Sequence, residues 1–194
     1  MKVFTVRFLT CLSLLLGMLI SSQSFAYSYA AAGKEPLIDG RETLMTALAN
    51  KDKSTATTTL DSLNDELVYL EEHHNVVLIK PMHEAVDALD SARLDKLLNL
   101  AYKAEIERRL EGAGDNLSDY QTAKVLVVKS KKFLDLLQSG IPADDWKRAE
   151  DALSQALESI GNPGVFGVGT KAPDPKAFEA AEKSVMDALG SVQG

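Results

Sequence analysis

Three histidines within eleven consecutive positions are the residues of this chain best suited to hold a metal ion. His73 and His74 are adjacent, Glu71 lies three positions before His74, and Met82 directly precedes His83. Imidazole, carboxylate and thioether groups are all ligands of transition metals. Because adjacent helical residues point about a quarter-turn or more apart, His73 and His74 are poorly placed to share one ion. Glu71 and His74 have the three-residue step that puts two ligands on one helix face.

The metal hypothesis therefore names His74, His83, Glu71 and Met82 as ligands of a copper, iron or zinc ion. The competing interpretation is a polar helix end, where histidine interacts favourably with the negative end of the helix dipole. Under that interpretation the chain needs no cofactor.

Two lysines on one expected helix form a candidate docking surface. Lys124 and Lys131 share one side of that helix, and Tyr120 lies at its start. In an acidic chain, a basic helix could dock an acidic protein partner or a second copy of the protein. The alternative is an ordinary water-facing side of an amphipathic helix.

A glycine-rich segment, Gly161–Gly169, carries the apolar residues Val165, Phe166 and Val168. Phosphate-binding glycine motifs need a preceding strand and a defined glycine spacing, and this segment has neither. Its apolar side chains either fold over the end of the helices or are offered to a partner. Burial under the last helix is the expectation, because an exposed phenylalanine lowers solubility. Phe166 is kept as a partner-binding candidate for the second case.

Charged residues are dense between positions 105 and 111. Glu105 lies one turn from Arg108 and Arg109, and Glu107 lies one turn from Glu111. Di-iron helical proteins use repeated Glu-x-x-His motifs, and this chain contains that spacing once. A solvated face of ion pairs is the interpretation. The sequence also shows no nucleophile elbow, supported catalytic triad or cofactor fingerprint, which indicates a protein that is not an enzyme.

The start of the chain has the order of a secretory signal peptide. Lys2 and Arg7 precede an apolar run over residues 8–20, and small residues flank Phe25 in the segment 24–26. The run is short for a membrane span. We expect residues 1–26 to be a signal peptide cleaved near Ala26, which would make the mature protein periplasmic or secreted. A later cut at 30–32 and an uncleaved anchor are the alternatives.

Composition limits the classes of partner. Cleavage would remove two positive charges and take the formal charge from −7 to −9. This balance argues against nucleic acid as a partner and against unassisted docking on anionic lipid. The only cysteine, Cys11, would leave with the signal, so the mature chain would have no disulfide and no thiolate site. No apolar run after residue 26 reaches membrane-spanning length, so no insertion is expected after cleavage.

Apolar residues recur at three- and four-residue steps through most of the remaining chain. This pattern predicts a flexible leader over residues 27–36 and one all-α domain over residues 37–194, with six or seven amphipathic helices. The helices are expected to begin at Asp39, Ser54, Pro81, Ser91, Ser118, Asp144 and Asp174. Glycine segments at Gly112–Asn116, Gly140 and Gly161 are expected to end helices, and Val76–Ile79 is expected to be a buried linker. A faint echo between residues 47–63 and 88–97 leaves stacked helical hairpins open.

These features together predict an exported, non-catalytic helical protein that acts by binding a protein partner. A small periplasmic metal-binding protein is the alternative.

Overall fold

The structure is a computed structural model of the chain, and it describes residues 33, 35–166 and 168–193. The chain divides into two compact units, residues 1–35 and residues 36–194. The expected signal peptide, residues 1–26, lies outside the described residues, as does most of the expected leader. The fold described below is that of residues 36–194.

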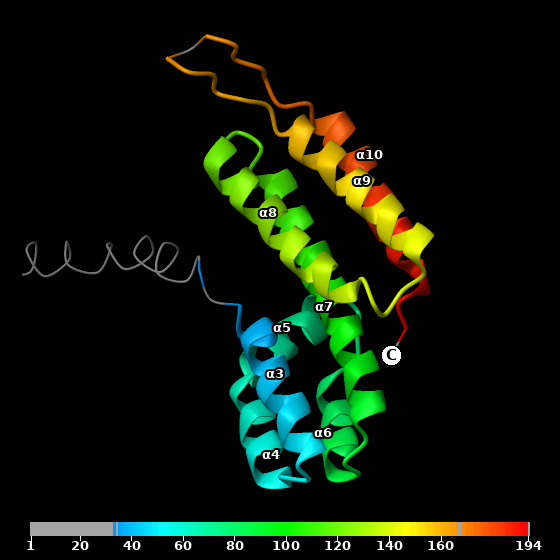
Figure 1. Cartoon of the computed structure of the whole chain (residues 1–194). Helices are drawn as coiled ribbons and strands as arrows, with labels where there is room; N and C mark the ends of the chain where they lie inside the picture. Colours follow the sequence, from blue (N-terminus) through cyan, green and yellow to red (C-terminus); the bar gives the residue numbers. More distant parts are fainter. Residues whose placement is uncertain (1–32, 34, 167, 194) are drawn as a thin grey trace, which may run out of the picture. The chain divides into compact units, whose positions relative to one another are not determined.

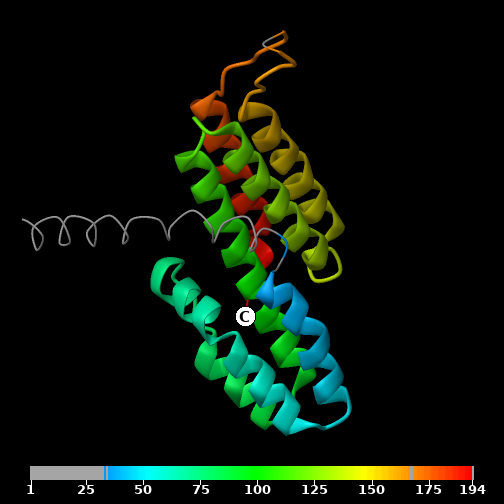
Figure 2. The same cartoon turned by 90° about the vertical axis from the view of Figure 1, so that its left-hand side faces the viewer.

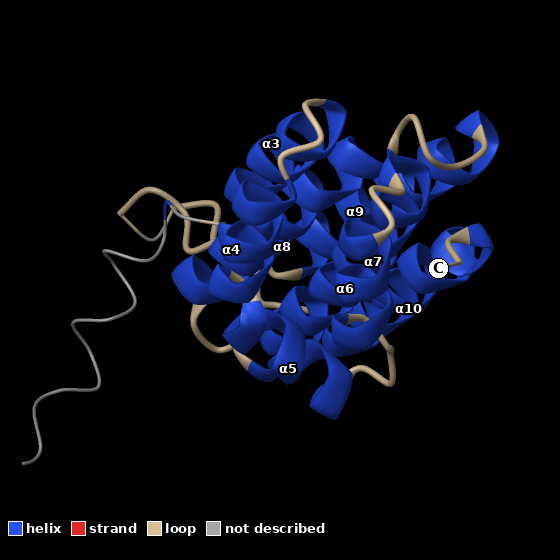
Figure 3. Ribbon diagram, turned by 90° about the horizontal axis from the view of Figure 1, so that it is seen from below, coloured by secondary structure: helices blue, strands red, loops and turns tan. Residues whose placement is uncertain are grey.

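Within the described residues the chain is all-α, as predicted (Figures 1 and 3). Its α-helices are α3 (Pro36–Ala49), α4 (Lys53–Ser62), α5 (Asn64–His73), α6 (Ile79–Asp87), α7 (Ser91–Asp115), α8 (Tyr120–Leu137), α9 (Ala143–Ser159) and α10 (Pro175–Ala188), followed by the 3-10 helix η2 (Leu189–Ser191). None of the helices in this part of the chain is long and apolar enough to cross a bilayer.

The prediction of six or seven helices is wrong, because the helix expected from Ser54 onward is two helices, α4 and α5. Leu63 separates them with a backbone near φ −95° and ψ 1°. Its side chain is buried and packs against α3 at Gly40, where an added Cβ would come within 3.0 Å of a Leu63 methyl group. The close approach of α3 at Gly40 therefore accommodates the residue at which the chain bends.

Helix α7 is the central helix of the domain. It has 25 residues, which at the usual rise of an α-helix makes it about 37 Å long. Helices α3, α5 and α6 pack along one part of it, and α8 and α10 pack along the rest (Figures 1 and 2). Other close neighbours are α3 with α4, α4 with α6, α8 with α9, and α9 with α10.

Two glycines expected to end α7 lie inside its last turns instead. An added Cβ at Gly112 would contact Leu126 of α8 at 3.4 Å, and one at Gly114 would contact Phe178 of α10 at 3.4 Å. The glycines therefore let two neighbouring helices approach α7 closely, and the helix runs on to Asp115.

Helix α8 packs against α7 through its buried face. Its buried residues include Ala123, Val127 and Phe133, and the ring of Phe133 lies 5.7 Å from that of Tyr102 on α7. Val125 and Val128, by contrast, are each 44% exposed. This leaves apolar side chains on the outer surface of α8.

Aspartates, rather than the expected serines, cap several helices. Asp52, Asp90 and Asp119 accept hydrogen bonds from the first-turn backbone N–H groups of α4, α7 and α8. These caps lie one or two residues from Ser54, Ser91 and Ser118. The cap at Asp174, followed by Pro175 in the first turn of α10, is confirmed.

The remaining starts also differ from the expected ones. Asp39 and Asp144 lie in the first turns of α3 and α9, and Pro81 is the third residue of α6. The segment before α6 is only partly the buried linker that was expected, because Leu78 is buried while Val77 is 68% exposed.

Candidate functional site

The connection between α9 and α10 folds back on itself as a finger. Asn162 and Lys171 exchange two backbone hydrogen bonds of 2.8 Å, and Val165 and Val168 exchange two of 3.0 Å. This pairing places Phe166 at the tip. In Figure 1 the finger, drawn in orange, extends beyond the adjoining ends of α9 and α10.

Local hydrogen bonds and glycines hold the finger in shape. The Asn162 side chain accepts from the N–H of Gly164 at 2.9 Å, and the Thr170 hydroxyl donates to the carbonyl of Pro163 at 3.1 Å. Gly161 and Gly164 have φ angles of +82° and +72°, and an added Cβ at either would collide with the opposite backbone. Both positions therefore require glycine.

The apolar side chains of the finger are exposed, so the expectation of burial under the last helix is wrong. Val165, Phe166 and Val168 are 72%, 102% and 79% exposed. The finger closes through its own backbone pairing and does not fold down onto α10. Phe166 also has a φ of +51°, in the left-handed region, where a residue with a Cβ costs roughly 1–2 kcal/mol.

A second apolar surface lies between α8 and α9. A groove of about 170 Å³ is lined by Val127, Val128, Lys131, Glu150, Leu153, Ser154 and Leu157. Val128 is 44% exposed and Leu157 is 38% exposed. Leu157 belongs to the last turns of α9, which lead directly into the finger. The finger and the part of the groove lined by Leu157 are therefore close along the chain.

The two candidate lysines on α8 have different surroundings. Lys124 is exposed, and its ammonium lies 5.6 Å from the ring centre of Tyr120, which is half-buried against the core. Lys131 is paired with Asp135 and Glu150 and lies 5.4 Å from the ring centre of Trp146. Although burial alone would lower it, hydrogen bonds and the charges of the two carboxylates raise the pKa of Lys131. Lys131 therefore joins α8 to α9, whereas Lys124 keeps its charge toward solvent.

The structure does not bring the four predicted metal ligands together. One oxygen of Glu71 accepts from the backbone N–H groups of Leu78 and Ile79, at 2.6 and 2.8 Å, and so caps α6. Met82 is fully buried in the core. The Nε2 atom of His83 lies 3.6 Å from Asp61 on α4.

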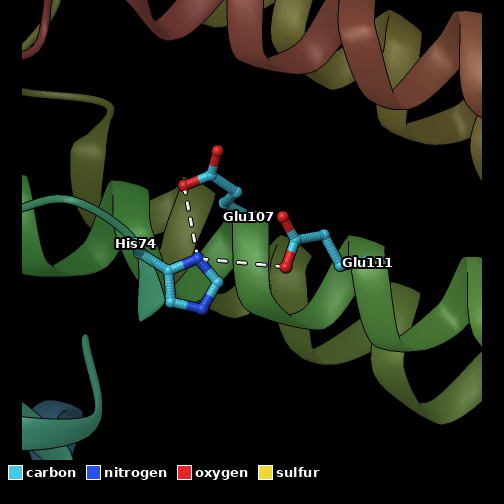
Figure 4. Close-up of side chains that lie close together, drawn as sticks. All are labelled: His74, Glu107 and Glu111. Carbon is cyan, nitrogen blue, oxygen red and sulfur yellow. Dashed lines mark ion pairs between the residues drawn. The ribbon is translucent and has the colours of Figure 1, made fainter. Parts of the chain in front are cut away.

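His74 instead meets two carboxylates of α7 (Figure 4). Its Nδ1 atom lies 3.4 Å from an oxygen of Glu107 and 4.0 Å from one of Glu111. The imidazole is buried, with 2% of its side chain exposed, and neither ring nitrogen has a hydrogen-bond partner among the described residues. Burial, followed by the charges of Glu111 and Glu107, raises the pKa of Glu182 on α10. Two carboxylates of α7 therefore face the imidazole of His74.

The charged segment of α7 is not the solvated ion-pair face that was expected. Glu105 and Arg109 are 2% and 6% exposed and form a buried ion pair. Arg108 also pairs with Glu105, at 3.1 Å. Arg109 lies over the ring of Phe133, 4.8 Å from its centre. Arg109 therefore links α7 to α8 through Phe133, while Glu107 and Glu111 face His74.

Comparisons of this chain with protein-family models, with curated proteins and with solved structures each found no match. Its function must therefore be inferred from its own geometry.

Proposed function

We propose that this chain is an exported, non-catalytic binding protein that engages a protein partner through the tip of the finger. The observation that carries the proposal is Phe166, an aromatic residue that is fully exposed and held in a left-handed backbone conformation. Asparagine or glycine would suit this turn position better. Folding gains nothing from a solvated phenylalanine in this position, which favours a role in binding.

The finger has the form of an anchor that enters a pocket on another protein. Large aromatic side chains that become buried at the centre of an interface supply much of the binding energy. Val165 and Val168 flank Phe166 and would widen the apolar contact. Because the finger is closed by its own hydrogen bonds, little conformational entropy would be lost when it binds.

A protein surface is a better counterpart for this tip than an anionic membrane. The chain has a formal charge of −7, and the expected cleavage would make it more negative. Anionic headgroups would repel such a chain. The apolar groove between α8 and α9 offers a second contact beside the finger, and Lys124 would add an exposed cation toward an acidic partner.

The proposal also includes an exported location and an arrangement of the helices as stacked hairpins. The basic start, short apolar run and small residues up to Ala26 support cleavage of residues 1–26 and a periplasmic or secreted location. The packing of consecutive helices as pairs agrees with stacked helical hairpins, which stay a prediction.

The test compares two apolar-to-polar substitutions at exposed positions. Purified wild-type protein, Phe166→Asn and the control Val77→Asn are immobilised and exposed to an envelope extract from the source cells. We expect one protein to be retained by the wild type and by Val77→Asn and to be lost with Phe166→Asn. Equal retention by all three proteins, or no retained protein, would contradict the proposal.

A further inference from the structure

We propose that His74, Glu107 and Glu111 form a binding site for a divalent first-row transition metal ion. This site is separate from the finger and does not depend on the proposed function. It shares only His74 with the ligand set that the sequence suggests.

The geometry is close to that of a three-ligand site. One nitrogen of His74 and one oxygen each of Glu107 and Glu111 all lie within 4.8 Å of one another. Ligands around a zinc ion at ordinary bond lengths stand about 3.3 Å apart. Glu107 and Glu111 are 36% and 57% exposed at their side chains, so their carboxylates have room for the small contraction required.

The surroundings of the His74 imidazole support the site independently of the distances between the ligand atoms. Its imidazole is buried, both ring nitrogens lack a hydrogen-bond partner in the part of the chain that the structure describes, and Nδ1 is directed at the two carboxylates (Figure 4). Buried polar groups are nearly always satisfied, so such a ring needs an explanation. Coordination to a metal ion would satisfy Nδ1.

The local backbone also favours a cation. His74 is the C-cap of α5, so it lies at the negative end of that helix dipole. Glu107 and Glu111 are four residues apart on α7 and thus on one helix face. A divalent cation would offset the repulsion among these carboxylates.

The ligand types define the class of ion. One imidazole nitrogen with two carboxylate oxygens suits zinc, manganese or ferrous iron. Cuprous ion prefers sulfur ligands, and the buried Met82 is already part of the core. Calcium takes six to eight oxygen ligands, and this cluster includes a buried nitrogen. Zinc is the appropriate probe, because it binds such sites more tightly than manganese or ferrous iron.

The experiment is a zinc titration of the metal-free mature protein, purified without an affinity tag. Calorimetry should show one zinc ion per chain. Glu107→Gln and Glu111→Gln should each weaken zinc binding by at least about tenfold, the scale of losses at disturbed metal sites. Glu72→Gln, an exposed carboxylate outside the cluster, and His83→Ala, the histidine beside Asp61, should bind zinc as the wild type does.

A second readout identifies the histidine. Cobalt(II) bound to the wild type should give visible absorption bands that His74→Ala removes and His83→Ala retains. If His74→Ala does not fold, the two glutamine variants decide, because their side chains are largely at the surface. Absence of stoichiometric zinc binding, or equal losses in the control variants, would overturn the site. If Phe166→Asn loses partner capture but still binds zinc, the metal site remains supported, because the two proposals are independent.

Discussion

Val165 and Val168 exchange both of their backbone hydrogen bonds, each 3.0 Å long, and this pairing holds Phe166 away from the helices. The tip is therefore built by the chain itself and does not depend on packing against α9 or α10. A tip of this kind can be altered without disturbing the core, so binding and folding can be tested separately.

Phe166→Asn should leave the free energy of unfolding unchanged or raise it by up to about 1 kcal/mol. The residue has a φ of +51° and no burial to lose, and asparagine tolerates the left-handed region better than phenylalanine does. Urea unfolding followed by circular dichroism measures the change. A loss of more than about 1 kcal/mol would mean that Phe166 packs against the domain after all.

Gly161→Ala should destabilise the base of the finger more than Gly169→Ala. Both glycines have positive φ, of +82° and +77°, but only at Gly161 would a Cβ meet the backbone of residues 171–173. Gly169→Ala should therefore cost about 1 kcal/mol for the backbone conformation alone. Urea unfolding and limited proteolysis of the finger give the comparison. Equal costs at the two positions would show that the base is not as closely packed as described.

Asp119→Asn should make the stability of the folded protein less dependent on pH in the acidic range. The backbone N–H and hydroxyl of Thr122 lower the pKa of Asp119. Because the folded pKa lies below the unfolded one, this contribution is present above the unfolded pKa and is lost as pH falls through the folded pKa. Melting temperatures between about pH 6 and pH 3, where carboxylates titrate, provide the test. The control Ser118→Ala replaces the expected cap and should keep the wild-type curve; a steeper change in Ser118→Ala would assign the cap to the serine.

Glu105→Gln should destabilise the domain by roughly 3–5 kcal/mol, because it removes a carboxylate that pairs with the buried Arg109. The double variant Glu105→Leu, Arg109→Met should recover most of that loss, since an apolar pair can replace a buried ion pair. Chemical unfolding of the single and double variants measures both values. A double variant as unstable as the single one would indicate that shape, rather than charge pairing, limits this position.

The sequence predicts the all-α class correctly because the apolar period of a helix is a local property. It does not predict the break between α4 and α5, because Leu60, Leu63 and Leu67 keep the same period across the bend. It places the end of α7 correctly within the segment 112–116, because the helix ends at Asp115, but it assigns the wrong role to two glycines. In the sequence, Gly112 and Gly114 suggest the end of a helix. In the structure they lie inside α7 and allow α8 and α10 to pack closely against it.

The candidate sites are predictable from the sequence only in part, because contacts between distant helices decide which residues meet. His74 is recognisable as a ligand, but its closest carboxylates lie on α7, more than thirty residues along the chain. The nearer Glu71 caps α6 instead. The exposure of Phe166 depends on pairing between Asn162 and Lys171, which a solubility argument does not include. These outcomes are set by tertiary contacts and not by local residue type.

Site-specific photocrosslinking in living source cells tests the central claim most directly. A photoreactive phenylalanine analogue replaces Phe166 in one strain and the exposed Val77 in a control strain. The proposal predicts a discrete protein adduct from position 166 and none of the same mass from position 77. The same adduct from both positions, adducts with lipid alone, or no adduct from position 166 would contradict it.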